Sequence, residues 1–288
     1  LDYTLVSAKL PDCQTSKRSF LPEVIFAGGW RSQNTRRVLA AFPNVPKVFC
    51  LDMPWRASLR CVLARWVLRP FLRQFRRIYV PGELTARYAR WLGFAPDRID
   101  RKLYSVRFDR FEDGDPGERK GFLYLGRFAS EKRVDLLCRA YGRYRELGGT
   151  WSLDLYGTGD LLPRPSSLVP GLLVHSFVQP DELPRIYRDH AGLLLASSFD
   201  PWPLVMLEAT AAGLTVIASD RCGNGEELGA RLFPFGDVEA MAQEMLKVER
   251  EWTAGRVRPA AGLANSLAKE YDCAAWAKRT MEIARGLK

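Results

Sequence analysis

Short apolar runs alternate with amphipathic stretches along the chain, and this alternation limits the folds that it can adopt. The apolar runs predict buried parallel strands at Tyr3–Ala8, Glu23–Ala27, Val48–Leu51, Arg77–Val80, Gly121–Leu125, Leu153–Tyr156, Leu172–His175, Gly192–Ala196 and Thr215–Ala218. The intervening stretches predict helices at Arg31–Phe42, Ala57–Phe75, Leu84–Trp91, Val134–Leu147, Asp181–Arg188 and Leu204–Ala212. Such alternation is typical of an α/β fold built on doubly wound parallel sheets.

A polar segment containing Gly and Pro, residues 112–118, interrupts this pattern and is followed at once by a new strand. We interpret it as a linker, because a chain of 288 residues suits two modest α/β domains. The expected organisation is a reduced N-terminal Rossmann-like domain at 1–117, a C-terminal Rossmann-like domain at 118–270 and a final amphipathic helix at 271–288.

The apolar stretches are too short to span a membrane, and no secretory signal opens the chain. The six cysteines are scattered and form no CxxC pair, which argues against a zinc site or a redox motif. These features favour a cytoplasmic protein with lone thiols.

The net charge of +10 is concentrated in the first part of the chain. Residues 1–118 contain 21 basic and 12 acidic side chains, whereas the remaining residues contain 22 and 21. The basic excess is densest between Met53 and Gly82, a stretch without any acidic residue. A field of this kind favours nucleic acid, an anionic membrane or a phosphorylated substrate as partner.

The pattern of this basic stretch predicts a helix that Pro70 kinks or splits. The arginines expected on one helical face are Arg56, Arg60, Arg69, Arg73, Arg76 and Arg77. The side chains expected to face inward are Leu59, Val62, Leu63, Trp66 and Phe71. Three interpretations stay open: a solvated helix face, a docking surface for anionic lipid headgroups, and a nucleic-acid patch. The last ranks behind because no nucleic-acid-binding motif accompanies the arginines.

Two strand-to-helix turns in the second half carry groups suited to a diphosphate. The first, at 126–133, follows a predicted strand and contains Arg127 and Lys132. The second contains Gly157 and Gly159, whose spacing lets a backbone turn tightly near a ligand. In parallel sheets such turns lie at the carboxyl edge, where ligands bind. Each motif alone is weak evidence for a ligand site, because solvent-exposed basic residues and ordinary turns have the same sequence pattern.

The most informative segment runs from Ser197 to Ala209 and holds two carboxylates, Asp200 and Glu208. Asp200 lies in a predicted loop beside a helix start, whose free N–H groups favour phosphate. Glu208 lies in an otherwise apolar helix that should be buried. A helix-capping acid explains Asp200 well, but a structural role explains Glu208 poorly, so we expect carboxylates that accept hydrogen bonds from sugar hydroxyls.

Taken in order, these motifs resemble the C-terminal domain of family 4 glycosyltransferases. The resemblance covers about residues 119–245 and includes Gly126-Arg127…Lys132, Gly157-Thr-Gly159, Val178…Glu182-Leu183, Ser197…Asp200…Glu208-Ala209…Ala212-Gly213 and Gly223…Glu226. It implies a GT-B fold, with two Rossmann-like domains facing across a cleft. It also implies a retaining transferase that uses a nucleoside-diphosphate sugar, UDP- or GDP-linked, without a metal.

The resemblance further implies roles for individual residues. Arg127 and Lys132 would hold the donor diphosphate and offset charge on the leaving group, Asp200 would contact the transferred sugar, and Glu208 would bind the ribose. The backbone near Phe177 and Val178 would border the base. The remaining residues expected at the donor site are Gly126, Gly157, Gly159, Ser197, Trp202, Leu204 and Val205.

Several positions depart from the family pattern. Asp200 stands where Glu is usual, Pro203 replaces a Gly and removes a backbone donor, and Ser176 stands where Gly is common. The early Gly-rich loop is absent before Gly28. For the acceptor side the candidate is Asp52, with helix capping an equal alternative.

The function expected from the sequence is therefore hexosyl transfer to a hydroxyl acceptor, a saccharide or a lipid-linked saccharide, in cell-envelope or exported polysaccharide assembly. The expected location of the protein is the cytoplasm, with peripheral association at the inner face of the cytoplasmic membrane through the basic stretch. No nucleic-acid partner is expected. The alternative is a non-catalytic GT-B-like protein that binds nucleotide sugars or acts as a scaffold.

Overall fold

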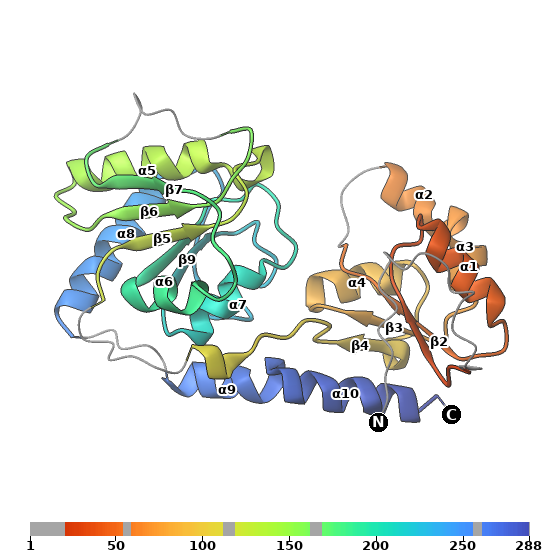
Figure 1. Cartoon of the computed structure of the whole chain (residues 1–288). Coiled ribbons are helices and arrows are strands. Elements are labelled where there is room, and N and C mark those ends of the chain that lie inside the picture. The colour runs from red at the N-terminus through yellow and green to blue at the C-terminus, as the bar shows by residue number, and fades with distance from the viewer. Residues whose placement is uncertain (1–20, 54–58, 112–118, 162–168, 256–260, 288) are drawn as a thin grey trace. The chain divides into compact units, whose positions relative to one another are not determined.

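The structure is a computed structural model, and it describes residues 21–53, 59–111, 119–161, 169–255 and 261–287. The chain divides into two compact units (Figure 1). The N-terminal unit comprises residues 1–103 and 279–288, and the C-terminal unit comprises residues 104–278. The strand expected at Tyr3–Ala8 and the linker expected at 112–118 lie outside the described residues.

The N-terminal unit is built on a parallel sheet in the order β1-β2-β3-β4. Its strands are β1 (Ile25–Ala27), β2 (Lys47–Cys50), β3 (Arg77–Val80) and β4 (Ile99–Arg101). Its helices are α1 (Gln33–Ala41), α2 (Leu59–Val67), α3 (Arg69–Leu72) and α4 (Glu83–Trp91). Phe49, Ile78 and Val80 are buried between sheet and helices, as the apolar runs predict.

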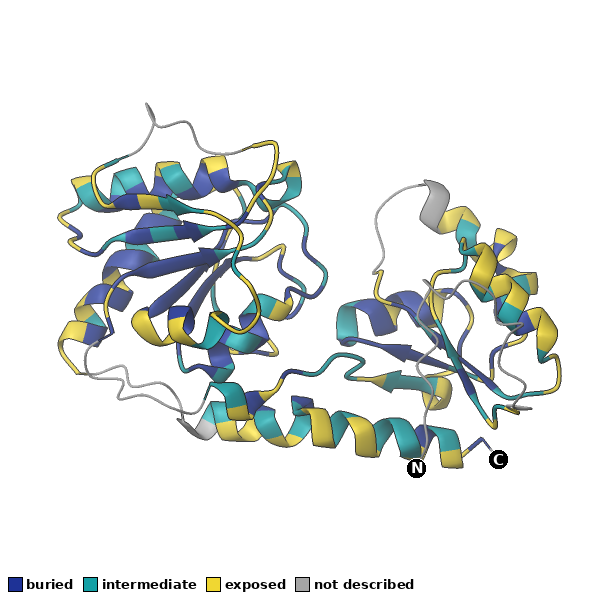
Figure 2. Cartoon of the chain, in the orientation of Figure 1, coloured by how far each residue is buried: buried dark blue, intermediate teal, exposed yellow. Residues whose placement is uncertain are grey.

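The predicted break at Pro70 is confirmed, because α2 ends at Val67 and a separate short helix, α3, begins at Arg69. The expected inward face of this stretch is wrong in part. Val62, Leu63 and Trp66 are 42%, 50% and 65% exposed, and Figure 2 shows α2 with many exposed positions. The apolar anchors after the break are instead Leu68, Leu72 and Phe75, all buried. Phe71 packs against them as expected.

The basic face is also shorter than expected. Arg77 is the first residue of β3, where its guanidinium forms a two-point ion pair with the Asp100 carboxylate at 2.6 and 2.7 Å. Arg76 lies between α3 and β3 and donates to the Leu287 carbonyl at 3.2 Å. Both side chains therefore have partners within the fold. Arg56 and the side chain of Arg60 lie outside the described residues.

The C-terminal unit is built on a parallel six-stranded sheet in the order β10-β9-β8-β5-β6-β7. The strands are β5 (Phe122–Leu125), β6 (Leu153–Tyr156), β7 (Leu172–His175), β8 (Gly192–Leu195), β9 (Thr215–Ser219) and β10 (Arg231–Phe233). The helices are α5 (Val134–Glu146), α6 (Leu183–Asp189), α7 (Leu204–Ala211), α8 (Val238–Thr253), α9 (Ala261–Tyr271) and α10 (Cys273–Arg285). In Figure 1, α5 and α8 cover one face of this sheet, and α6 and α7 lie on the other.

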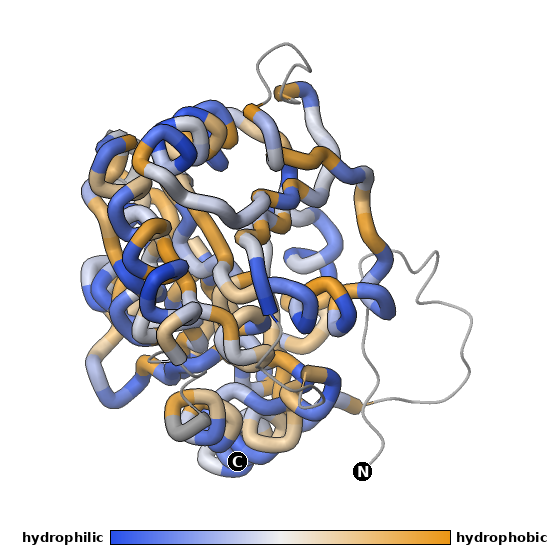
Figure 3. Tube along the Cα trace, turned by 90° about the vertical axis from the view of Figure 1, so that its left-hand side faces the viewer, coloured by the Kyte–Doolittle hydropathy of each residue, from blue (hydrophilic) through white to orange (hydrophobic). Residues whose placement is uncertain are grey.

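Apolar side chains from the strands and from one side of each helix form the core of the C-terminal unit. The central strand β8 is buried at all four positions, and Phe122, Leu123 and Tyr124 of β5 are fully buried beside it. Along the helices the tube in Figure 3 alternates between hydrophilic and hydrophobic segments, as amphipathic helices require. The expected α/β fold with two parallel sheets is confirmed.

The end of α10 belongs to the N-terminal unit, where the Arg279 guanidinium donates to the Lys102 carbonyl at 3.0 Å. Among the described residues, no helix has both the length and the apolar character needed to cross a bilayer.

Candidate donor-binding site

The strand order of the C-terminal unit reverses direction between β5 and β8. From β5 the chain continues outward to β6 and β7, and from β8 it continues the other way to β9 and β10. In sheets of this kind ligands bind outside the carboxyl ends of the strands at such a reversal. The loops that follow β5 and β8 are those that contain Lys132 and Asp200, so the fold brings the two main sequence motifs to this point.

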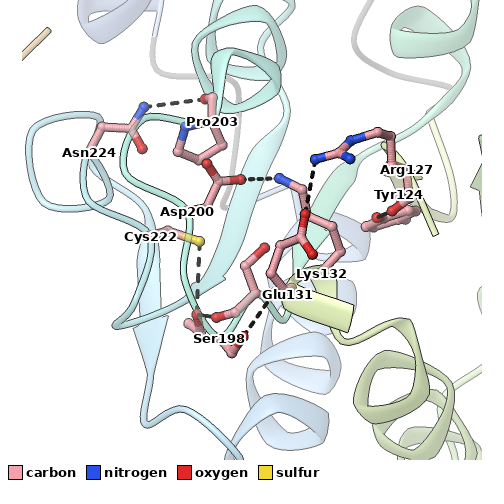
Figure 4. Close-up of polar contacts among 11 residues, drawn as sticks. Tyr124, Arg127, Glu131, Lys132, Ser198, Asp200, Pro203, Cys222 and Asn224 are labelled. Atoms are coloured by element: carbon pink, nitrogen blue, oxygen red, sulfur yellow. Dashed lines mark hydrogen bonds and ion pairs between the residues drawn. The ribbon is translucent and has the colours of Figure 1, made fainter. Parts of the chain in front are cut away.

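The Lys132 ammonium and the Asp200 carboxylate meet there as an ion pair (Figure 4). Their side chains are 20% and 9% exposed, so the pair is largely shielded from solvent. The two loops are held together by the backbone N–H of Ser198, which donates to the Glu131 carbonyl at 2.8 Å. A basic group and an acidic group are thus fixed side by side at the carboxyl edge of the sheet.

Backbone contacts on its other side hold Asp200 in place. Its N–H donates to the Arg221 carbonyl at 3.2 Å, and its own carbonyl accepts from the Gly223 N–H at 2.8 Å. The Asn224 side-chain amide donates to the Pro203 carbonyl at 3.3 Å, which joins the loop after β9 to the start of α7. These contacts explain why the segment 223–226 accompanies the acidic motif in the sequence.

Arg127 lies in the same loop as Lys132 but has a different partner. Its guanidinium donates to the Glu131 carboxylate at 2.9 Å, and its side chain is 74% exposed. The backbone beneath it is fixed, because the hydroxyl of Tyr124 donates to the Arg127 carbonyl at 2.8 Å. The backbone of Arg127 is therefore fixed, while its guanidinium is exposed. The guanidinium is free to exchange the Glu131 carboxylate for an incoming anion.

A left-handed residue ends the turn that carries Lys132. Arg133 has φ of 49° and ψ of 47°, and it separates the short 3-10 turn Ser130–Lys132 from α5. This conformation costs a residue with a side chain about 1–2 kcal/mol. The Arg133 guanidinium offsets part of this cost by a two-point contact with Asp135 at 2.9 and 2.8 Å. Backbone strain of this kind is concentrated at functional sites.

Two of the three glycines expected at the donor site, Gly157 and Gly159, are required by contact between two loops. A Cβ on Gly157 would lie 1.9 Å from the Gly126 carbonyl oxygen, and a Cβ on Gly159 would lie 2.4 Å from that of Phe128. The loops are joined by hydrogen bonds from Gly126 N–H to Tyr156 and from Phe128 N–H to Thr158, at 3.0 and 2.8 Å. The glycines therefore allow the backbones of the two loops to pack directly against each other at the carboxyl edge of the sheet.

Glu208 lies on α7 and accepts a hydrogen bond from the Tyr187 hydroxyl at 2.7 Å. Burial raises the pKa of the Glu208 carboxyl above its usual value, and the Tyr187 hydrogen bond offsets part of that rise. The rest of the helix is apolar, with Met206, Leu207 and Ala209 buried. Glu208 is thus an acid held in an unfavourable environment, a feature common at functional sites.

The sequence motifs do not reveal Tyr187. It is fully buried on α6, and its ring packs edge-on against Phe111 with centroids 5.5 Å apart. Because it lies 21 residues before its partner and in another helix, only the fold brings the two together. Glu131 is inside a recognised motif, but its contact with Arg127 is likewise visible only in the structure.

The other expected residues have different surroundings. Trp202 is buried with its ring 5.9 Å from that of Tyr271. Phe177 is 62% exposed in the loop after β7, and Leu204 is 38% exposed at the start of α7. Of the remaining three, Ser197 is buried, and Val178 and Val205 are half-buried.

Asp52 lies in the N-terminal unit, two residues beyond the end of β2, and is exposed. It follows Leu51, whose N–H extends the strand pairing by donating to the Tyr79 carbonyl at 3.0 Å. The acid therefore lies at the carboxyl edge of its own sheet, as expected for a residue after a strand.

Comparison with known proteins gives the region around this site an identity. Residues 119–250 match the sequence model of the family described as glycosyl transferases group 1. An exopolysaccharide phosphotransferase of Streptomyces coelicolor is 29% identical over 132 residues, which cover 42% of this chain and 14% of that protein. The chain thus spans a small part of this curated relative.

Two solved structures share the architecture. Sucrose-phosphate synthase from Thermosynechococcus elongatus superimposes with a TM-score of 0.73 at 18% identity, over 92% of this chain and 73% of that one. Anabaena HepE, solved in complex with UDP, superimposes with a TM-score of 0.74 at 13% identity, over 92% and 79%. These likenesses show that the chain has a GT-B fold, and its residues 119–250 match the group 1 glycosyltransferases.

Proposed function

We propose that the protein transfers a hexosyl group from a nucleoside-diphosphate sugar to a hydroxyl acceptor, with retention of anomeric configuration. The observation that carries this proposal is the meeting of Lys132 and Asp200 at the strand-order reversal, with Arg127 exposed in the same loop. A structural neighbour has been solved with UDP, which supports a nucleotide-linked donor.

In the proposed reaction the bond between the sugar and the diphosphate breaks, and a bond from the same carbon to the acceptor oxygen forms. Negative charge grows on the departing diphosphate. Lys132 and Arg127 stabilise that charge, the task that a metal performs in other transferases, so we propose that the reaction is metal-independent. Preorganised charges of this kind act most strongly where solvent is excluded, which suits the shielded position of Lys132.

The carboxylates of Asp200 and Glu208 bind two other parts of the donor, the transferred sugar and the ribose. Asp200 accepts hydrogen bonds from hydroxyls of the transferred sugar, once the donor diphosphate competes for the Lys132 ammonium. Glu208 accepts from the ribose hydroxyls, and Tyr187 keeps its carboxylate oriented from α6. Phe177 and Val178 border the base. The side chain of Asp200 is one methylene shorter than Glu, which favours a sugar that approaches this edge closely.

The acceptor that we propose is a saccharide or a lipid-linked saccharide in cell-envelope or exported polysaccharide assembly. The exopolysaccharide-related relative and the basic N-terminal unit support this choice. The same basic surface supports peripheral association with the inner face of the cytoplasmic membrane.

The test is turnover of a panel of UDP- and GDP-linked hexoses by the purified chain, with water and with simple saccharides as acceptors. Release of nucleoside diphosphate and an anomeric proton coupling that matches that of the donor are the expected results. Binding of a nucleotide without turnover on any acceptor would favour the non-catalytic alternative. A product of opposite anomeric configuration would contradict retention.

A further inference from the structure

A pocket of about 600 Å³ lies in the N-terminal unit, and none of its lining residues is assigned to sugar transfer. Its lining comes from the end of α2, from α3 and from the turn between α4 and β4. Arg73 and Phe75 precede β3 in the chain, while Phe94 and Arg98 precede β4. Since both segments lead into the starts of parallel strands, the pocket lies at the amino edge of this sheet, whereas ligands of such sheets bind at the carboxyl edge.

Four arginines line this pocket: Arg65, Arg69, Arg73 and Arg98. In the part of the chain that the structure describes, none of them has a carboxylate within ion-pair distance. Neighbouring arginines of the same unit behave differently, since Arg77 pairs with Asp100 and both Arg90 and Arg101 pair with Glu83 at 2.6 Å. The pocket therefore concentrates positive charge that the fold does not neutralise, and it is complementary to an anion.

The walls beneath the arginines are apolar. Leu72, Phe75, Leu92 and Phe94 line the pocket and belong to the buried core of the unit. An anion with an apolar portion suits such walls better than a fully hydrated one, because the apolar portion would be removed from water. The Arg65 guanidinium lies over the Trp91 ring, 5.6 Å from its centroid, which shows how this surface combines cations with aromatic rings.

An exposed apolar ridge adjoins the pocket on α2. It consists of Val62, Leu63, Trp66 and Val67, which are 42%, 50%, 65% and 70% exposed. Trp66 also lines the pocket, so ridge and pocket are continuous. Exposed Trp and aliphatic side chains beside arginines are the composition of surfaces that lie in the membrane interface.

We propose that this pocket receives the phosphate group of an anionic membrane lipid while the ridge enters the headgroup region. The arginines would donate to the phosphate oxygens, and the apolar walls would contact the glycerol and the upper part of the acyl chains. The proposal extends the peripheral membrane association proposed above and gives it a defined site. It does not depend on the donor site, which lies in the other unit.

The test is flotation of the purified full chain with phosphatidylcholine vesicles, with and without phosphatidylglycerol. The test variant is Arg69→Gln/Arg73→Gln. The matched control is Arg37→Gln/Arg139→Gln, which removes the same charge from exposed helix positions outside the pocket. Each arginine at an anionic surface contributes about fivefold to binding, so the test variant should bind about thirtyfold more weakly. The control should bind as the wild type does.

Two further measurements separate the possible outcomes. Trp66→Ser should weaken vesicle binding, whereas a purely electrostatic surface would not respond to it. Inorganic phosphate should raise the melting temperature far less than glycerophosphate lipid in vesicles; a strong response to phosphate without vesicle binding would assign the pocket to a soluble anion and overturn the proposal. Equal binding by test and control variants would also overturn it. Nucleotide binding, measured on the same samples, reports separately on the proposed transferase.

Discussion

Replacing Lys132 by Met is the perturbation that bears most directly on the ion pair at the strand-order reversal. The substitution leaves the Asp200 carboxylate, whose side chain is 9% exposed, without its cationic partner. Unit charges about 4 Å apart interact by about 4 kcal/mol at the effective dielectric constant of such sites. Breaking a buried pair by removing one partner costs about 3–5 kcal/mol.

The exposed fraction of Lys132 reduces that cost. Because the side chain is 20% exposed, water reaches part of the pair, and we expect a loss of about 2–3 kcal/mol in the free energy of unfolding. Asp200→Asn should cost less, because the freed ammonium can turn towards solvent. The double variant contains no unpaired charge, so its loss should fall short of the sum of the two single losses by about 1–2 kcal/mol.

The assay is urea unfolding of the four proteins, followed by the fluorescence of the C-terminal unit or by circular dichroism. Lys120→Met, which removes an exposed lysine of the same unit, is the matched control and should change stability by less than about 0.5 kcal/mol. Strict additivity in the double variant, or a Lys132→Met loss no larger than that of the control, would refute the reasoning.

The remaining predictions concern the residues proposed to bind the donor and the backbone contacts that hold them in place. Arg127→Ala and Lys132→Ala should each lower turnover by about a hundredfold or more, with circular dichroism showing a retained fold; near-normal turnover of either would remove its assigned role. Glu208→Gln should weaken nucleotide binding in calorimetry yet preserve or raise stability at neutral pH, because burial raises the pKa of this carboxyl and its charged form is disfavoured in the fold; unchanged affinity would count against ribose binding. Gly157→Ala should destabilise the C-terminal unit by about 1–3 kcal/mol, since the new Cβ would lie 1.9 Å from the Gly126 carbonyl oxygen, and a wild-type urea midpoint would contradict that contact.

A pH dependence is expected from Asp154 on β6, whose carboxylate contacts both histidines of the chain, His175 at 2.5 Å and His190 at 3.2 Å. Burial acts to raise the pKa of Asp154, but the hydrogen bonds from His190 and His175 outweigh it, so the pKa lies below its usual value of 3.8. The stabilisation is therefore present above that value and lost as the pH falls through the lowered pKa. The stability difference between wild type and Asp154→Asn should shrink as the pH falls below about 4. A difference independent of pH would exclude the effect.

Most strands could be predicted from the sequence, and two short edge strands with charged residues could not. β3, β6 and β7 have the predicted bounds because each consists mainly of apolar residues. β4 and β10 were not predicted because each is an edge strand of three residues with charged members, such as Asp100 and Arg231. In these two strands charged residues interrupt a run of only three positions, so the apolar signal is absent.

The inward face of α2 shows a second limit. Helical periodicity identifies the apolar side of a helix, but not whether other elements of the fold cover that side. The pattern therefore predicts Trp66 in the core, whereas the side chain lies on the surface. Packing between elements is equally hidden from the sequence at the proposed donor site. Sequence spacing placed Lys132 and Asp200 at one edge of the sheet, since both follow parallel strands, but the partners Glu131 and Tyr187 depend on packing between elements distant in the sequence.

The central claim is that the edge formed by Lys132, Asp200 and Glu208 binds a nucleoside-diphosphate sugar. The most direct measurement is the melting temperature of the wild type and of Lys132→Met with a panel of UDP- and GDP-linked hexoses. A ligand present at a hundred times its dissociation constant stabilises the fold by about 2.7 kcal/mol, which should raise the melting temperature by a few degrees. The account predicts such a rise with at least one donor in the wild type and its loss in the variant. No rise with any donor, or an equal rise in both proteins, would contradict it.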